Sequence, residues 1–317
     1  MSMGYTLRVS VLESCQLRCG YCLPCGSSEV SPSRTWLNGD QYKRLARAFF
    51  HLGIDKVRFT GGEPLLRKDL PAIVEIFAKE LSHAHFALTT NGLLFISMSD
   101  ALVSAGLDSI TFHLDTLRDE RYGQLMGRGR IKDVLKGVDR ALDLGLTVKI
   151  NTVIQKSRND DELSNFLEFS RDMGVMVRFI EQMNTGSAPR HVRNTFMSGE
   201  EILKSISQRF ELHPMGRRNI SDPAEVFMAK GIGVEFGLIA SDTRPFCSEC
   251  MRIRLSVDGR IRTCLYEPRG TKLSLAPELG PEAILFDLKS IVANKSSFHP
   301  MMGSARPRSF SMSQVGG

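Results

Sequence analysis

Three cysteines near the start of the chain have a spacing that could hold a metal centre. Cys15, Cys19 and Cys22 form a C-x3-C-x2-C pattern, directly after an apolar run from Leu7 to Leu12. Thiolates from one short loop can each bind one iron of a four-iron cluster and leave the fourth iron open to an outside ligand. A structural zinc loop or a set of buried thiols would use the same residues, so the spacing alone leaves these alternatives open.

A second group of three cysteines lies in the last third of the chain. Cys247, Cys250 and Cys264 follow a C-x2-C-x13-C pattern that again lacks a fourth ligand, since the nearest histidines are His213 and His299. Two incomplete zinc sites would be a coincidence, whereas two clusters with one open iron each form a consistent design. We therefore expect two [4Fe-4S] clusters.

The segment Gly61-Gly62-Glu63-Pro64 follows a predicted strand and could lie against a ligand. Glycines let the backbone approach a bound molecule closely, and a carboxylate there can accept hydrogen bonds from an amine. A simple tight turn would explain the segment equally well. The segment is not a P-loop, because the lysine and hydroxyl that complete such a loop are missing.

Positively charged side chains within short apolar segments form a third candidate group. They share a position where burial is costly unless the charge is paired, and they are Arg8, Arg58, Lys149, Arg178, Arg252 and Arg254. Because Arg252 and Arg254 are two residues apart, a strand there would direct both to one face. Arginine suits phosphate oxygens, so we interpret the set as a cage for one polyanionic ligand. The alternative is pairing with carboxylates such as Glu63, Asp115 or Glu181.

Alternating strand and helix patterns would bring these residues together. The strand candidates are short apolar runs, each followed by a helical pattern: Leu7–Leu12, Lys56–Thr60, His85–Thr90, Ser109–Leu114, Val148–Ile154 and Met176–Glu181. Six such units in series indicate a parallel sheet, either open and doubly wound or, as we favour, an incomplete (β/α)6 TIM-type barrel. Chemistry in a barrel belongs at the C-terminal ends of the strands. His113, at one such end, could be a base, a hydrogen-bond donor or a structural residue.

The strand–helix rhythm stops near residue 213, which suggests two parts. We predict that residues 1–213 form the barrel. Residues 214–317 would form an iron–sulfur module that covers the barrel mouth and ends in a mobile tail with Gly316-Gly317.

Composition narrows the class of protein. The 317 residues are 42% hydrophobic and carry a net charge of +6, without a run long enough to span a membrane. The first residues lack a signal pattern, so we expect a cytoplasmic protein with no membrane contact. Scattered basic residues without interleaved aromatics disfavour nucleic-acid binding. Seven cysteines in a reducing compartment indicate metal binding or catalysis, although we interpret Cys25 as an ordinary loop residue.

The first cysteine motif, with Tyr21 before its last cysteine, resembles the signature of the radical S-adenosylmethionine (SAM) superfamily. The segment Thr60–Pro64 resembles that superfamily's second motif. The whole pattern is similar to the MoaA-type GTP 3',8-cyclases of molybdenum cofactor biosynthesis. Its most specific part is Phe246-Cys247-x2-Cys250-x-Arg252-x-Arg254-Leu255, and the chain ends in two glycines as that family does.

The resemblance implies a role for each matching residue. Cys15, Cys19 and Cys22 would hold a first cluster whose open iron binds SAM. The SAM site would be lined by Tyr21, Gly62, His113 and Met183, although the family usually has a serine at position 113. A second cluster, facing the guanine of GTP, would be held by Cys247, Cys250 and Cys264. Contacts with GTP are implied for Arg8, Arg58, Thr89, Lys149, Arg178, Arg252 and Arg254, the last two also as catalytic residues.

The implied activity is that of a lyase. SAM would be cleaved to a 5'-deoxyadenosyl radical that takes hydrogen from the GTP ribose, and the ribose carbon would then attack guanine C8. The implied partners are an external electron donor and a downstream cyclic pyranopterin monophosphate synthase, and the protein could be a homodimer. Two other hypotheses remain: a radical SAM enzyme with an auxiliary cluster that acts on a peptide or protein, and a zinc-stapled binding protein without catalysis.

Overall fold

The structure is a computed structural model that describes residues 4–22, 36–183, 194–267 and 269–295. Cys25, interpreted as an ordinary loop residue, and the predicted tail with Gly316-Gly317 lie outside these residues. Within the described chain, no helix combines the length and the apolar character that crossing a membrane requires.

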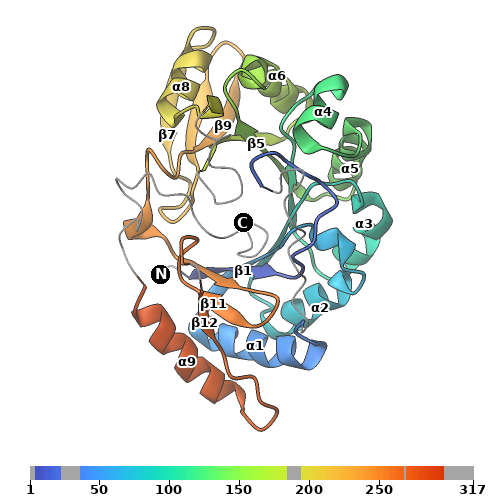
Figure 1. Cartoon of the computed structure of the whole chain (residues 1–317), viewed down its shortest axis with the longest axis vertical. Coiled ribbons are helices and arrows are strands. Elements are labelled where there is room, and N and C mark those ends of the chain that lie inside the picture. The colour runs from blue at the N-terminus through green and yellow to red at the C-terminus, as the bar shows by residue number, and fades with distance from the viewer. Residues whose placement is uncertain (1–3, 23–35, 184–193, 268, 296–317) are drawn as a thin grey trace.

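Six parallel strands follow one another across the sheet in the same order as in the sequence. They are β1 (Tyr5–Ser10), β2 (Ile54–Thr60), β3 (His85–Thr90), β4 (Ser109–His113), β5 (Thr147–Ile154) and β6 (Met176–Glu181). The helices between and after them are α1 (Gly39–Leu52), α2 (Leu70–Glu80), α3 (Phe95–Ser104), α4 (Asp119–Met126), α5 (Ile131–Asp143) and α6 (Leu163–Met173). Figure 1 shows these helices around the outside of the curved sheet. The prediction of an incomplete (β/α)6 barrel is confirmed, and α4 is a helix that the sequence analysis missed.

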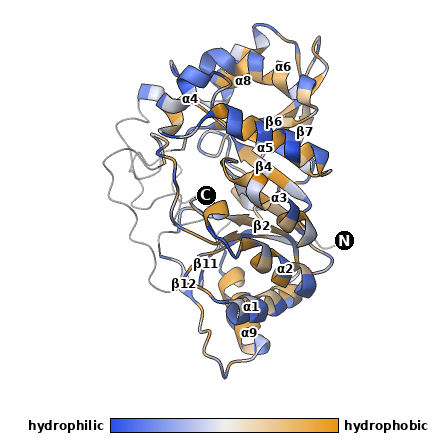
Figure 2. Ribbon diagram, turned by 90° about the vertical axis from the view of Figure 1, so that its right-hand side faces the viewer, coloured by the Kyte–Doolittle hydropathy of each residue, from blue (hydrophilic) through white to orange (hydrophobic). Residues whose placement is uncertain are grey.

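Local sequence signals explain why the first helix lies where it does. Asn38 and Gln41 form a capping box at the start of α1, each bonding the other's backbone. Gly53 ends the helix in the left-handed region (φ 81°), which costs glycine little. The buried face of α1 includes Leu45 and Phe49. In Figure 2 the helices carry both hydrophilic and hydrophobic residues, as expected of elements with one side on a core.

The last third of the chain extends both edges of the same sheet. On one side β9 (Val234–Ile239) pairs in parallel with β6, and β8 (Glu225–Ala229) and β7 (Leu212–Gly216) continue antiparallel. On the other side β10 (Arg252–Leu255) pairs in parallel with β1, followed by β11 (Arg260–Arg262) and β12 (Thr271–Lys272). The last third is therefore built onto the barrel sheet, and the predicted boundary after residue 213 falls inside β7.

Two helices complete this part of the chain. Helix α8 (Gly199–Ser207) is the helix expected after the sixth strand, and it starts with a capping box of Ser198 and Glu201. Helix α9 (Pro281–Ala293), which was not predicted, packs against α1. It leads back to β10 at Lys295, whose ammonium donates to the Arg252 carbonyl oxygen (3.1 Å).

Candidate active site

One cavity of about 390 Å³ lies inside the barrel and collects the predicted site residues. Every residue that the sequence analysis assigned to the site lines this cavity. They are Arg8, Cys15, Cys19, Tyr21, Cys22, Arg58, Gly62, Thr89, His113, Lys149, Arg178, Met183, Cys247, Cys250, Arg252, Arg254 and Cys264.

The Gly-Gly-Glu segment holds the first cysteine loop by backbone contact. The Gly62 N–H donates to the Leu12 carbonyl (2.6 Å), and the Glu63 N–H donates to the Ser14 carbonyl (2.8 Å). A Cβ on Gly62 would lie 2.3 Å from the Ser14 oxygen, so a larger residue would push the cysteine loop away. The segment is therefore a clamp that fixes the loop carrying Cys15.

The Glu63 carboxylate is used inside the protein. It is 1% exposed and accepts hydrogen bonds from the Leu65 N–H (3.0 Å), the Thr90 hydroxyl (2.6 Å) and the Asn91 N–H (2.7 Å). Burial raises its pKa to about 7, against these hydrogen bonds. In this structure the carboxylate ties the end of β2 to the end of β3, which agrees with the turn-like alternative for this segment.

The first three thiols are largely shielded from water. Burial raises the pKa of Cys15 to about 11 and that of Cys22 to about 12, and it also raises the pKa of Cys19. Cys22 and Cys15 raise the pKa of Cys19 further, and Cys15 also raises the pKa of Cys22. The Cys15 sulfur accepts hydrogen bonds from the Leu17 N–H (3.4 Å) and the Asn91 amide (3.8 Å).

Cations lie beside part of the second group of thiols, although burial and the other two thiols raise the pKa of Cys247. Burial alone would raise the pKa of Cys250, but Arg252 and Lys295 lower it to about 7. The Lys295 ammonium donates to the backbone carbonyls of Arg252, two residues after Cys250, and of Thr263, which precedes Cys264. The guanidinium of Arg252 stacks on the Phe246 ring, 4.7 Å from its centroid.

These two groups of thiols fit iron–sulfur clusters. In the described parts of the chain, no three His, Cys, Asp or Glu side chains are arranged to hold a single metal ion. A four-iron cluster takes one thiolate per iron, so its ligands surround a cube and need not meet at one point. The donor set, three free cysteines facing the cavity in each group, therefore suits a cluster at either place.

Tyr21, His113 and Asp115 form a hydrogen-bonded group beside the first thiols. The Tyr21 hydroxyl lies 2.7 Å from the buried Asp115 carboxylate and 2.5 Å from His113 Nε2, which is itself 3.2 Å from Asp115. Burial alone would lower the pKa of His113, but the charge and hydrogen bond of Asp115 raise it overall. His113 thus faces the cavity with a partner that orients its ring.

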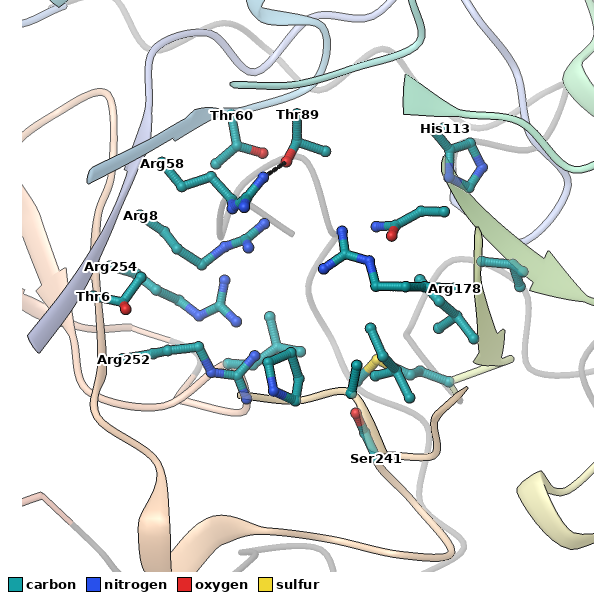
Figure 3. A pocket seen from close by; sticks show the side chains of 18 of the residues that line it. Thr6, Arg8, Arg58, Thr60, Thr89, His113, Arg178, Ser241, Arg252 and Arg254 are labelled. Carbon is teal, nitrogen blue, oxygen red and sulfur yellow. Dashed lines mark hydrogen bonds between the residues drawn. The ribbon is translucent and has the colours of Figure 1, made fainter. Parts of the chain in front are cut away.

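The positively charged side chains form rows across the sheet. Strand register places Arg254, Arg8 and Arg58 next to one another on β10, β1 and β2. Figure 3 shows these three and Arg252 extending into the cavity from one side, with Arg178 extending from the other. Arg58 donates to the hydroxyls of Thr89 (3.0 Å) and Thr111 (3.1 Å), and Arg178 donates to Thr111 (3.2 Å).

The electrostatics of this cage favour a bound anion. Burial and then the neighbouring positive charges lower the pKa of Arg8 and of Arg178, and they lower that of Lys149 to about 8. The three carboxylates that the sequence analysis considered as partners of the cage are engaged elsewhere. Glu63 and Asp115 have the partners described above, and Glu181 accepts from the backbone of Gly199, Asp242 and Thr243. An anionic ligand would relieve this repulsion.

Three charged residues of the cavity were missed by sequence reasoning, namely Lys56, Arg218 and Asp222. Lys56 lies two residues before Arg58 on β2 and also lines the cavity. Because side chains alternate between the two faces of a strand, its position relative to Arg58 could have identified it. Asp222 lines it from the loop between β7 and β8, where no local sequence pattern marks it.

Fold and site together define a β/α barrel with two cysteine groups on one cation-lined cavity. Residues 9–170 match the family described as Radical SAM superfamily, and residues 175–299 match Molybdenum Cofactor Synthesis C. A solved structure of Streptococcus suis SuiB bound to the precursor peptide SuiA is similar in fold, with a TM-score of 0.66. It is 17% identical, covers 98% of this chain and 68% of that chain, and so supports the fold alone.

Curated relatives refine this class. The GTP 3',8-cyclase of Aquifex aeolicus is 39% identical over 269 residues, which cover 84% of this chain and 83% of the relative. The GTP 3',8-cyclase of Streptomyces coelicolor is 42% identical over 273 residues, covering 85% and 80%. The chain therefore belongs to the radical SAM superfamily and, within it, to the family of the GTP 3',8-cyclases.

Proposed function

We propose that this protein is a GTP 3',8-cyclase, a radical SAM lyase of molybdenum cofactor biosynthesis. It would convert GTP to (8S)-3',8-cyclo-7,8-dihydroguanosine 5'-triphosphate. The observation that carries the proposal is the joint position of two cysteine groups and a polycationic cage on one cavity. The names of the curated relatives support the same activity.

The first cysteine loop would hold the cluster that works with SAM. Cys15, Cys19 and Cys22 would be its ligands, and the clamp at Gly62 fixes the loop that presents them. When bound, the cluster and SAM supply one-electron cleavage of SAM and hydrogen abstraction from the substrate. Tyr21 and His113, held by Asp115, would orient the cofactor next to the loop.

The cage would bind the triphosphate of GTP. Guanidinium groups match phosphate oxygens in charge and in geometry, and the row of Arg254, Arg8 and Arg58 offers several such groups side by side. Thr89 and Thr111 hold the Arg58 guanidinium in place. With the triphosphate fixed there, the sugar and base of GTP would extend toward the cysteine groups.

The second cysteine group would hold a second cluster near the base. Cys247, Cys250 and Cys264 would be its ligands, and the adjacent charges of Arg252 and Lys295 favour thiolates there. The C-terminal segments that carry these residues form part of the cavity wall, so they would help to keep water away from a reactive species. An external reductant and an enzyme that consumes the cyclic triphosphate would complete the reaction sequence.

The test is anaerobic incubation of the reconstituted protein with SAM, a reductant and GTP. We expect formation of 5'-deoxyadenosine that depends on GTP, together with a cyclised guanosine triphosphate detected by mass spectrometry. Production of 5'-deoxyadenosine with a peptide but not with GTP would contradict the proposal in favour of a peptide-modifying radical SAM enzyme. Protein that takes up zinc but no iron would contradict it in favour of a binding protein.

A further inference from the structure

The cation cage contains one carboxylate that is not used to build the fold. Three acidic residues line the cavity within the described chain: Glu63, Glu181 and Asp222. The first two accept hydrogen bonds from backbone N–H groups, as described above. Asp222 instead acts electrostatically on the cage, since its charge opposes the lowering of pKa at Arg58, Lys149 and Arg178.

The loop between β7 and β8 holds Asp222 in a defined position. The Asp222 N–H donates to the Asn219 carbonyl (2.9 Å), and the Asn219 side chain accepts from the Ser221 N–H (3.0 Å). At the base of the loop, Arg217 pairs with Glu225 (3.1 Å). The turn and the ion pair present the carboxylate to the cavity in one place.

Packing against β9 brings this loop close to the cage. A Cβ built on Gly237 would lie 2.9 Å from the Arg178 side chain and 3.2 Å from the Cβ of Ala224. Arg178 and Ala224 thus share the space that the missing side chain of Gly237 leaves. Ala224 is two residues from Asp222, and both residues line the same cavity as Arg178.

We propose that Asp222 is a built-in counter-charge that weakens the hold of the cage on a triphosphate. This inference rests on the proposed function, in which the cage binds the triphosphate of GTP. Substrate and product both carry that group, so a cage made of cations alone would bind the product as tightly as the substrate. A fixed carboxylate repels the phosphates and lets the cyclised triphosphate leave.

The sign of the expected effect separates this role from others. If Asp222 bound the substrate directly or through a metal ion, neutralising it would weaken binding. If it only stabilised the loop, neutralising it would leave binding unchanged or weaker. As a counter-charge, its neutralisation strengthens the binding of polyanions.

The experiment compares wild type, Asp222→Asn and Asp222→Ala as reconstituted holoproteins. Binding of inorganic triphosphate is measured by anaerobic calorimetry at two salt concentrations. We expect both variants to bind at least about tenfold more tightly, which is the effect of a unit charge about 12 Å from the phosphates at an effective dielectric constant of about 20. The gain should shrink at higher salt. Glu211→Gln removes the same charge at an exposed position and should leave the affinity unchanged.

Two outcomes overturn the inference in different ways. Wild-type protein that binds inorganic triphosphate while neither variant binds it more tightly contradicts the counter-charge role alone. Wild-type protein that binds neither inorganic triphosphate nor GTP contradicts the proposed function, and this inference with it. Thermal unfolding and iron content of each variant identify a change caused by misfolding, and two independent substitutions make the comparison robust.

Discussion

The two cysteine groups have the same ligand chemistry but different electrostatic surroundings. Around Cys15, Cys19 and Cys22, burial raises the pKa of each thiol, and the charges of Glu63 and Asp115 raise those of Cys15 and Cys19 further. Around Cys250, Arg252 and Lys295 bring positive charge, and the pKa falls to about 7. Buried surroundings disfavour added negative charge, whereas cations favour it.

This difference indicates a division of labour across the cavity. The first group belongs to the rigid end of the barrel, where the Gly62 clamp and the Tyr21–Asp115 pair leave it little freedom. The second group continues the cation cage, because Arg252 and Arg254 lie on the strand that follows Cys250. We therefore expect substitutions around the first cysteine group to affect SAM binding and cleavage, and substitutions around the second group to affect GTP binding.

The largest expected effect comes from removing one ligand on either side. Cys19→Ala should lose one cluster and, with it, all cleavage of SAM, because the loop can no longer present three thiolates. Cys264→Ala should also lose one cluster and all cyclised product, but it should still cleave SAM when given a strong reductant. Iron content and 5'-deoxyadenosine, measured anaerobically, check both. Equal loss of SAM cleavage in the two variants would contradict the proposed division of roles between the two cysteine groups.

A smaller effect is expected from one cation of the cage. Arg178→Gln should weaken GTP binding by roughly 1.5–3 kcal/mol, about tenfold to a hundredfold, since charge-assisted hydrogen bonds to phosphate are lost. SAM binding should be unaffected. Arg171→Gln is the matched control, because Arg171 lies on α6, is half exposed and pairs with Asp172 at the surface. Calorimetry with each ligand measures both affinities, and a variant that loses SAM instead of GTP would reverse our assignment.

The smallest effect concerns pH. Burial and neighbouring cations lower the pKa of Lys149 to about 8, and a bound triphosphate would raise it again. The complex then binds more protons than the free protein. The affinity for GTP is therefore highest below pH 8 and falls as the pH rises above 8. We expect a loss of up to about tenfold between pH 7 and pH 9.

Lys149→Arg tests this assignment, because arginine stays protonated over that range. The variant should keep its GTP affinity at pH 9, and the SAM affinity of either protein should not follow the same curve. Titration by calorimetry at three pH values is sufficient. An identical fall in wild type and variant would show that another group titrates.

The barrel and its contents could be predicted from the sequence because the signals are local. Strand and helix periods identify β1 to β6 within two residues at most ends, and the cysteine spacings identify both thiol groups. Polar residues such as Arg8 and Arg58 stand out because they interrupt apolar strands. Barrel topology then brings them together, since side chains on neighbouring parallel strands share one interior.

The features that sequence reasoning missed depend on contacts between distant segments. The pairing of β9 with β6 and of β10 with β1 arises from strands more than 50 residues apart, and no local period reveals it. Asp222 reaches the cage only because that pairing places its loop there. Likewise, whether Glu63 and Asp115 would pair with the cage or with the fold was decided by the Thr90 hydroxyl and the Tyr21 hydroxyl, which lie on other elements.

Electron paramagnetic resonance of the reduced clusters tests the central claim most directly. Cys264→Ala should keep only the first cluster, and Cys19→Ala only the second. Our account predicts that SAM changes the spectrum of Cys264→Ala and GTP does not, whereas GTP changes the spectrum of Cys19→Ala and SAM does not. A first cluster that responds to GTP alone, or a second that responds to SAM alone, would contradict the division of the cavity described here.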